Sequence, residues 1–189
     1  MTEADVADRA RGLLGRLLHG HGVTVRITEV EAYGGVLDPA SHAFTRTARS
    51  EIMYGPPWRL YVYRSYGMHY CANVVTGPTD QAAAVLVRAG AVVDGIDLAR
   101  ERRGPAVTDD GLARGPGNLA QALGLTLDDL GTDLLSPDGV RLGPEVPPPD
   151  DVRSGPRVGV SKAADVPWRF WIAGEPSVSA YRRNPRAAS

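Results

Sequence analysis

Hydrophobic and polar residues alternate over several short segments of the chain, and this pattern predicts β-strands. The alternation from Val23 to Tyr33 is typical of a strand, because successive side chains point to opposite faces. Residues 59–64 and 68–75 follow the same pattern around a tight turn at Gly67, which predicts a hairpin. Residues 82–93 are almost entirely apolar, as expected of a strand that is buried on both faces. Two later strands are predicted at residues 158–160 and 168–172.

Helical spacing of apolar residues predicts a few helices around these strands. The three segments are residues 2–19, 93–103 and 118–124. Gly-Pro-Gly introduces the last of them and Gly124 ends it, since glycine is common just past a helix C-terminus. The final segment, residues 178–182, has no clear pattern. Hairpins of strands with a few surrounding helices predict an α+β fold whose core is a mostly antiparallel sheet.

Length and composition favour one compact domain over residues 1–189. With 43% hydrophobic residues the chain can bury a core, and a Pro-rich, acidic stretch at 142–151 is interpreted as a surface loop. The single cysteine, Cys71, rules out an internal disulfide, and the four histidines match no metal-ligand spacing, so no metal is expected. The N-terminus lacks the features of a signal peptide and the longest apolar stretch is too short for a bilayer, so we expect a soluble intracellular protein.

The net charge of −1 hides an uneven distribution along the chain. Residues 1–39 sum to −2, 40–103 to +3, 104–151 to −7 and 152–189 to +5. If the two basic segments come together in space, they form a modest positive face suited to phosphates. The total therefore argues against a uniformly basic nucleic-acid binder but leaves room for one basic face.

Three side chains of the first predicted strand, Glu29, Glu31 and Tyr33, are spaced to share one face. Acids on a strand face are usually exposed to water, so a solvated edge is one interpretation. The other is that one of the acids takes part in chemistry. Strand geometry gives no way to choose between the two carboxylates.

Arg88 lies within the apolar stretch, where a buried guanidinium is costly unless it is paired and hydrogen-bonded. One alternative places it at the strand end with its charge in water. The other places it in a pocket, next to an ordered water or an acid, and Glu31 is then the candidate partner.

Aromatic residues gather around the predicted hairpin. Tyr61 and Tyr63 share a strand face, and their simplest role is packing within the sheet. Tyr66 lies at the tip of the turn beside arginines, where a ring has little core to pack against and is suited to wedging into stacked bases. His42 follows a turn-forming segment and is either a loop residue or a pocket residue. Asn73 lies on an otherwise apolar strand, where its amide needs hydrogen-bond partners whether it is structural or reads a ligand edge.

Several of these residues stand in motifs that resemble the 3-methyladenine (alkyladenine, or N-methylpurine) DNA glycosylases. The resemblance runs in order from about Ala10 to Tyr181 and covers nearly the whole chain. The motifs are Glu31-Ala-Tyr33, His42, Leu60-Tyr-Val-Tyr-Arg-Ser-Tyr-Gly-Met68, Cys71-Ala-Asn73, Val85-Leu-Val-Arg-Ala89, Ala113-Arg-Gly-Pro-Gly117 before Leu119-Ala-Gln-Ala-Leu123, Arg157-Val-Gly-Val160, Pro167-Trp-Arg-Phe170 and Pro176-Ser-Val-Ser179. No single motif is decisive, but together, at compatible spacings, they are strongly specific.

The resemblance implies a single α+β domain that acts on double-stranded DNA without a metal or an organic cofactor. Such an enzyme flips an alkylated or deaminated purine nucleotide out of the duplex and hydrolyses its N-glycosidic bond in base excision repair. The resemblance also implies a monomer with no membrane partner. Its expected location is cytoplasmic, of the bacterial type, on the nucleoid when bound to DNA.

Carried over residue by residue, the resemblance assigns roles to seven side chains. Glu31 is the general base that activates water, and Arg88 holds that water and the carboxylate. Asn73 stands where bulky groups of normal purines are rejected, and Tyr66 intercalates into the gap left in the DNA. The base pocket comprises Tyr33, His42, Tyr63 and Asn73. Because an N-alkylated purine is positively charged, a cage of tyrosines is expected to hold it by cation–π attraction.

Composition adds a prediction about the nucleophile. Glycosylases that also cut the DNA strand use an amine to form a Schiff base. The only side-chain amine is that of Lys162, which is distant in sequence from Glu31, while the N-terminal amine stays open as an alternative nucleophile. This composition predicts a monofunctional enzyme that leaves an abasic site. One departure from the family's pattern is Asn118, where lysine is common. We expect Asn118 to cap the helix that follows, and any contact made by a lysine there is in doubt.

Two rival interpretations stay open from the sequence. The first is a non-catalytic DNA-binding module on the same fold, which requires the basic strands and Tyr66 but not Glu31 together with Arg88. The second is an unrelated hydrolase of nucleosides or small ligands, which predicts no salt-sensitive DNA binding. The sequence does not predict the lesion preference, the general acid for neutral lesions or protein partners.

Overall fold

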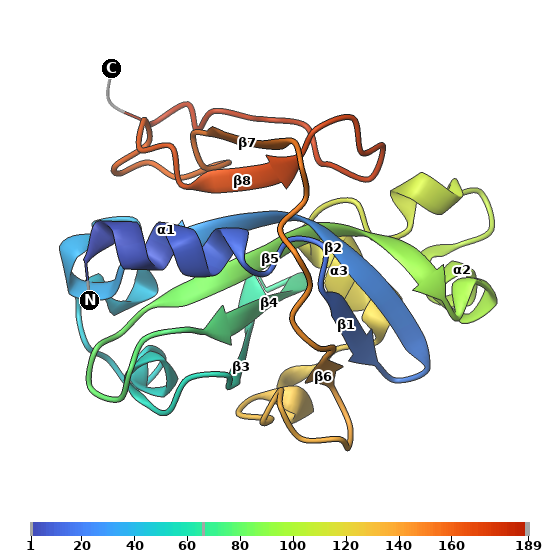
Figure 1. Cartoon of the computed structure of the whole chain (residues 1–189), viewed down its shortest axis with the longest axis horizontal. Helices are drawn as coiled ribbons and strands as arrows, with labels where there is room; N and C mark the ends of the chain where they lie inside the picture. Colours follow the sequence, from blue (N-terminus) through green and yellow to red (C-terminus); the bar gives the residue numbers. More distant parts are fainter. Residues whose placement is uncertain (1, 66, 188–189) are drawn as a thin grey trace.

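The computed structural model describes residues 2–65 and 67–187 (Figure 1). The strands of this part are β1 (Leu17–Gly20), β2 (Val23–Tyr33), β3 (Leu60–Ser65), β4 (His69–Val75), β5 (Ala84–Asp94), β6 (Arg141–Leu142), β7 (Val152–Gly155) and β8 (Arg169–Ile172). The α-helices are α1 (Glu3–Arg11), α2 (Ile96–Arg103) and α3 (Pro116–Leu123). Short 3-10 helices are η1 (Gly35–Leu37), η2 (His42–Phe44), η3 (Glu51–Tyr54), η4 (Asp109–Gly111) and η5 (Leu127–Asp129).

The strands form one antiparallel sheet in which β2 makes the most pairings. β5 pairs with one edge of β2 along most of its length, and β4 and β3 follow beyond β5. On the other edge, β1 pairs with residues 23–26 and β8 with residues 29–31, so two strands share that edge of β2. β6 extends the sheet beyond β1, and β7 pairs only with β8 among the described strands. The predicted α+β class with an antiparallel core sheet is confirmed.

The hydrophobic core lies between the sheet and the helices. Alternate residues of β2 point into it, and Val23, Val25 and Ile27 are at most 1% exposed. α1 packs against β2, while α3 packs against β4 and β5 (Figure 1). Removal of these apolar surfaces from water is the main force that holds the layers together. In the described part of the chain, none of the helices has the length and apolar character needed to cross a membrane.

Most predicted elements are present with small shifts of their ends. β2 has the predicted bounds, the predicted hairpin is formed by β3 and β4, and β5, α2, α3 and β8 lie where the sequence pattern indicated. Gly124 ends α3 in the left-handed conformation, with φ of 72°, as expected of a glycine C-cap.

Two predictions about elements are wrong. The helix predicted over residues 2–19 ends at Arg11, and residues 17–20 form β1. Leucines at 17 and 18 satisfy helical spacing, but pairing with β2 gives that segment its backbone hydrogen bonds. The strand predicted at 158–160 is a series of bends instead. The sequence pattern also did not predict β6 and β7, which are short and depend on pairing with distant strands. The Pro-rich stretch is at the surface over residues 144–148, but Leu142 at its start is buried against β1.

A buried ion pair joins the segment after β2 to the C-terminal part of the chain. The two terminal nitrogens of Arg157 donate to the two carboxylate oxygens of Asp38 at 2.6 and 2.9 Å, and both side chains are at most 1% exposed. Arg157 also donates to the carbonyl oxygen of Ala32 at 3.0 Å, and its guanidinium carbon lies 4.8 Å from the centre of the Tyr33 ring. The ion pair therefore supports both Tyr33 and the loop that leads to His42.

We expect Asp38→Asn to lower the free energy of unfolding by about 3–5 kcal/mol, because Arg157 is then left buried with an unpaired charge. The matched control is Asp151→Asn, which removes the carboxylate of the exposed Arg153–Asp151 pair and should have a much smaller effect. Chemical denaturation of both variants measures the difference. Equal changes in the two variants would contradict the structural importance of the buried pair.

Candidate active site

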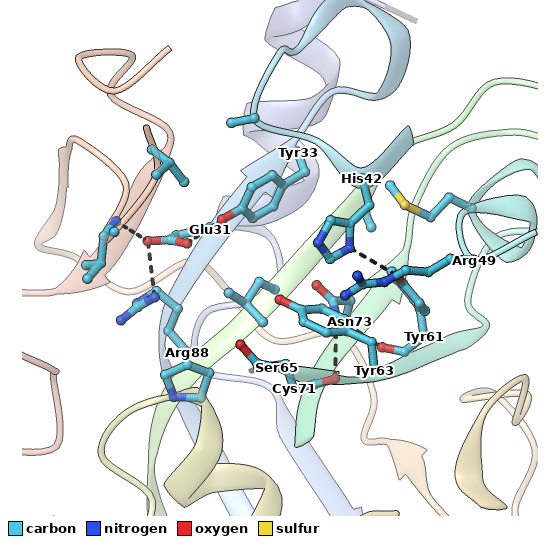
Figure 2. Close-up of a pocket in the computed structure, with 18 of the residues that line it drawn as sticks. Glu31, Tyr33, His42, Arg49, Tyr61, Tyr63, Ser65, Cys71, Asn73 and Arg88 are labelled. Carbon is cyan, nitrogen blue, oxygen red and sulfur yellow. Dashed lines mark hydrogen bonds and ion pairs between the residues drawn. The ribbon is translucent and has the colours of Figure 1, made fainter. Parts of the chain in front are cut away.

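A pocket of about 530 Å³ opens between β2, β3, β4 and β5 and is completed by the loop after β2 and by residues 158–160 (Figure 2). This volume lies within the usual range for small-molecule sites, about 300–1,000 Å³. One end of the pocket contains the charged side chains of Glu31 and Arg88. The opposite end contains the rings of His42, Tyr61 and Tyr63.

Glu31 projects from β2 at the charged end, and its carboxylate is held from three sides. The Tyr33 hydroxyl donates to Oε2 at 2.8 Å, and the backbone N–H of Val158 donates to Oε1 at 2.7 Å. Arg88 Nη1 lies 3.4 Å from Oε1, so the predicted contact between Arg88 and Glu31 is confirmed. Burial first, and the neighbouring charge of Glu31 second, raise the pKa of Tyr33 well above its ordinary value. The Tyr33 hydroxyl thus stays protonated and remains a donor to Glu31.

A β-bulge directs Arg88 towards the acids. The register between β2 and β5 passes from Glu29 opposite Ala89 to Val30 opposite Val87, which leaves Arg88 without a partner in the ladder. Its side chain is 8% exposed, so the alternative of a guanidinium in water is wrong. Burial lowers the pKa of Arg88, but the charges of Glu31 and Glu29 outweigh that effect and raise the pKa above its ordinary value.

Glu29 is also fully buried, but it faces the interior and not the pocket. Arg88 Nε and Arg169 Nε donate to its Oε1 at 3.0 and 2.6 Å. The backbone N–H of Ser179 donates to Oε2 at 2.7 Å, and the Ser179 hydroxyl donates to Oε1 at 3.0 Å. Glu29 is therefore the structural acid of the pair, joining β2 to β5, β8 and the C-terminal segment, while Glu31 faces the pocket.

The aromatic end of the pocket is made of three rings in mutual contact. His42 and Tyr63 meet edge to face, with ring centres 4.7 Å apart and planes at 75°, and Tyr61 packs beside Tyr63 with centres 5.4 Å apart. His42 Nδ1 lies 3.0 Å from the Tyr61 hydroxyl. Packing against these neighbours, together with the positive charge of Arg49, lowers the pKa of His42 to about 4. The imidazole is therefore neutral at pH 7, and the three uncharged rings are suited to stacking on a flat ligand.

Asn73 and Cys71 lie between the two ends of the pocket (Figure 2). The Asn73 amide nitrogen donates to the carbonyl oxygen of Tyr61 at 3.0 Å, which fixes the amide at a position that is 4% exposed. Cys71 is a buried free thiol, and burial raises its pKa, so it stays protonated. Neither residue adds charge to the pocket.

The structure brings six of the seven predicted site residues together around the pocket, and the seventh, Tyr66, lies outside the described residues. Sequence reasoning missed two groups of the pocket, the Arg49 side chain and the backbone amide of Val158. Arg49 stands among other polar residues in the loop after η2, so nothing in the local sequence marked it as a pocket residue. For Ser179, which binds Glu29, the family motif Pro176-Ser-Val-Ser179 was the one indication in the sequence of a role near the site. Asn118 does not cap α3 as expected, because its amide donates to the carbonyl oxygen of Arg114 at 2.7 Å.

The pocket thus has an acid beside a buried arginine at one end and packed aromatic rings at the other. The chain matches the family described as Methylpurine-DNA glycosylase (MPG) over residues 1–176 and belongs to this family. The family resemblance noted in the sequence is thus confirmed.

Three similar proteins share the name "Putative 3-methyladenine DNA glycosylase". The protein from Mycolicibacterium paratuberculosis is 55% identical over 190 residues, which cover 97% of this chain and 92% of that protein. The protein from Nocardia farcinica is 56% identical over 192 residues, covering 97% and 90%. The protein from Mycobacterium tuberculosis is 53% identical over 190 residues, covering 97% and 93%. The similarity extends over nearly the full length of each chain.

We expect Glu29→Gln to lower the free energy of unfolding by about 3–5 kcal/mol, because Arg88 and Arg169 would lose their shared buried carboxylate. Glu31→Gln should lower it by less than half as much, since Arg88 keeps its closer contact with Glu29 in that variant. Chemical denaturation of the two variants measures the change in the free energy of unfolding for each of these acids, which are only two positions apart. A larger loss for Glu31→Gln would show that the structural and pocket-facing roles are assigned the wrong way round.

Proposed function

We propose that this member of the methylpurine-DNA glycosylase family flips an alkylated or deaminated purine out of duplex DNA and hydrolyses its N-glycosidic bond with a water activated by Glu31. The observation that carries the proposal is the position of the Glu31 carboxylate, at the wall of an aromatic pocket and within 3.4 Å of Arg88. The product is an abasic site in an intact strand. Flipping costs a few kcal/mol, and least for a damaged base, which itself favours lesions.

In the proposed reaction Glu31 accepts a proton from the attacking water. The water oxygen forms a bond to C1′ of the deoxyribose, and the electron pair of the C1′–N9 bond leaves with the purine. A cationic, N-alkylated purine leaves readily because it departs as a neutral base. The carboxylate also stabilises the positive charge that develops on the sugar. Arg88, held by Glu29, keeps both the carboxylate and the water in position.

The rest of the pocket supports recognition of a flipped base. Tyr33, His42 and Tyr63 offer ring surfaces for stacking, and the neutral imidazole of His42 avoids placing a second charge against the base. Asn73 is held by the Tyr61 carbonyl, which suits it to rejecting the bulky exocyclic groups of normal purines. We assign Tyr66, which lies outside the described residues, to the gap that the flipped nucleotide leaves in the duplex. The protein is proposed to act as a monomer on double-stranded DNA.

We expect Glu31→Gln to reduce excision by about 100- to 10,000-fold while DNA binding is retained, because the amide cannot take the proton from water. Duplex oligonucleotides that carry one hypoxanthine, ethenoadenine or 3-methyladenine provide the substrates, and single-turnover excision is compared with equilibrium binding. Glu175→Gln is the control, since it neutralises an acid that pairs with Arg26 outside the pocket.

Excision that is unchanged by Glu31→Gln would exclude Glu31 as the base. Salt-sensitive DNA binding by the wild-type protein without excision of any of the three lesions would favour the non-catalytic DNA-binding module. Cleavage of free nucleosides without DNA binding would favour a small-molecule hydrolase.

The proposal of a monofunctional enzyme depends on where the amine of the only lysine, Lys162, lies. Lys162 follows the pocket-lining residues 158–160, so the fold brings it nearer to Glu31 than the sequence suggested. Its side chain is exposed, with Nζ 5.8 Å from the centre of the Phe44 ring, and it does not line the pocket.

We expect no protein–DNA adduct when borohydride is added during excision, because water and not an amine attacks C1′. Gel electrophoresis of the reaction with labelled DNA detects such an adduct, and Lys162→Arg is the comparison. An adduct that forms with the wild type and disappears in the variant would identify Lys162 as a nucleophile. An adduct that persists in the variant would implicate the N-terminal amine, and either result would overturn the monofunctional assignment.

A further inference from the structure

Arg49 carries a positive charge into the aromatic end of the pocket. Its guanidinium carbon lies 4.8 Å from the centre of the Tyr63 ring, and Figure 2 shows the group pointing into the pocket next to the rings of His42 and Tyr63. Burial raises the pKa of the Tyr61 hydroxyl, and the neighbouring Arg49 guanidinium opposes this shift, as expected of a positive charge close to that hydroxyl. A planar guanidinium stacks well on an aromatic face, so Arg49 occupies a surface that a flipped purine would use.

Arg49 forms no ion pair with an acid among the described residues, although it contacts the aromatic end of the pocket. Arg46, three residues earlier, pairs with Glu51 through two hydrogen bonds of 2.9 and 2.5 Å. In residues 2–65 and 67–187, none of the ion pairs involves Arg49. Among the described residues that line the pocket, Glu31 is the one acid, and it faces Arg88 at the other end. The aromatic end therefore presents an uncompensated positive charge.

This charge changes what the aromatic rings can recognise. Cation–π attraction from Tyr63 is already directed at the Arg49 guanidinium, so it gives a cationic base little advantage. A positively charged purine stacked at this end would also lie in contact with a like charge, and like charges repel. A neutral purine meets no such repulsion, and an oxygen or unprotonated nitrogen on its edge can accept a hydrogen bond from the guanidinium.

We propose that Arg49 is a specificity-determining residue that makes the pocket favour neutral damaged purines with a hydrogen-bond acceptor, such as hypoxanthine, over N-alkylated purines that carry a positive charge. This inference rests on the proposed glycosylase function and narrows its substrate class. It requires the loop after η2 to keep Arg49 at the pocket when DNA is bound. The Arg49 side chain is exposed, so a base can enter beside it without rearrangement of the buried sheet.

The test compares single-turnover excision of hypoxanthine and of 7-methylguanine from duplexes of one sequence, after subtraction of spontaneous base loss. Arg49→Met keeps the length of the side chain and removes its charge and donors. We expect the ratio of the hypoxanthine rate to the 7-methylguanine rate to fall by about tenfold, through a slower first reaction, a faster second one, or both. Arg49→Lys keeps the charge but loses the planar donors, so 7-methylguanine excision should stay within about twofold of the wild type while hypoxanthine excision falls.

Arg46→Met is the matched control, because Arg46 lies in the same loop, stacks on Tyr54 and does not line the pocket. It should leave the ratio unchanged, and thermal unfolding checks that all variants fold. Arg49→Met could instead slow both reactions equally and reduce the slope of log K for DNA binding against log salt concentration by about one. Arg49 would then be a contact to a DNA phosphate, and the proposal would fail. An unchanged or increased ratio also overturns it, while Glu31-dependent excision would leave the proposed function intact. A wild-type protein that excises neither base would overturn both.

Discussion

Four buried charges hold the charged end of the pocket together: the carboxylates of Glu29 and Glu31 and the guanidiniums of Arg88 and Arg169, on side chains that are all between 0% and 8% exposed. Any one of them alone would be too costly to bury, so each depends on the others. The two acids come from one strand, and the arginines come from the strands paired with its two edges. The bulge that leaves Arg88 out of the ladder is what allows it to reach both carboxylates. The pocket-facing acid thus has a fixed position because the interior acid is saturated with partners.

The arginines around the pocket differ in how firmly they are held. Arg157 is fully buried, with two hydrogen bonds to Asp38, and its guanidinium packs against the ring of Tyr33. Arg49 also contacts a tyrosine ring, but it is exposed and has no carboxylate partner among the described residues. The arginines at the charged end are thus held by buried carboxylates, whereas Arg49 at the aromatic end is not. This division suits the reaction proposed above, in which Glu31 and the water are held in place at one end while the base enters the other.

Local sequence patterns correctly predicted the elements that are marked by neighbouring residues, such as alternating strands and helices that end at a glycine. The alternation over residues 23–33 located β2, and glycine at the end of α3 located its C-terminus. It failed where two patterns were equally satisfied, as in residues 17–20, where leucines with helical spacing form a strand because β2 and β6 supply partners. It also failed for residues 158–160, whose short apolar pattern resembles a strand but whose backbone bends to line the pocket and donates to Glu31. In these places the competing tertiary contacts outweigh local preference.

The sequence by itself determined the class of fold, the order of the main elements, the family and most of the residues that gather at the pocket, because each is recorded in short-range patterns and motifs. Strand spacing alone did not distinguish the two acids, and the family resemblance assigned the reactive role to Glu31. Only the tertiary structure supplied the physical reason why Glu31 faces the pocket while Glu29 is buried among partners. That difference depends on partners such as Arg88 and Ser179, 59 and 150 residues away from Glu29 along the chain. The placement of Arg49 against Tyr63 was likewise decided by folding. Spacing along a strand specifies a shared face, but the burial and pairing of charges depend on which distant segments cover that face.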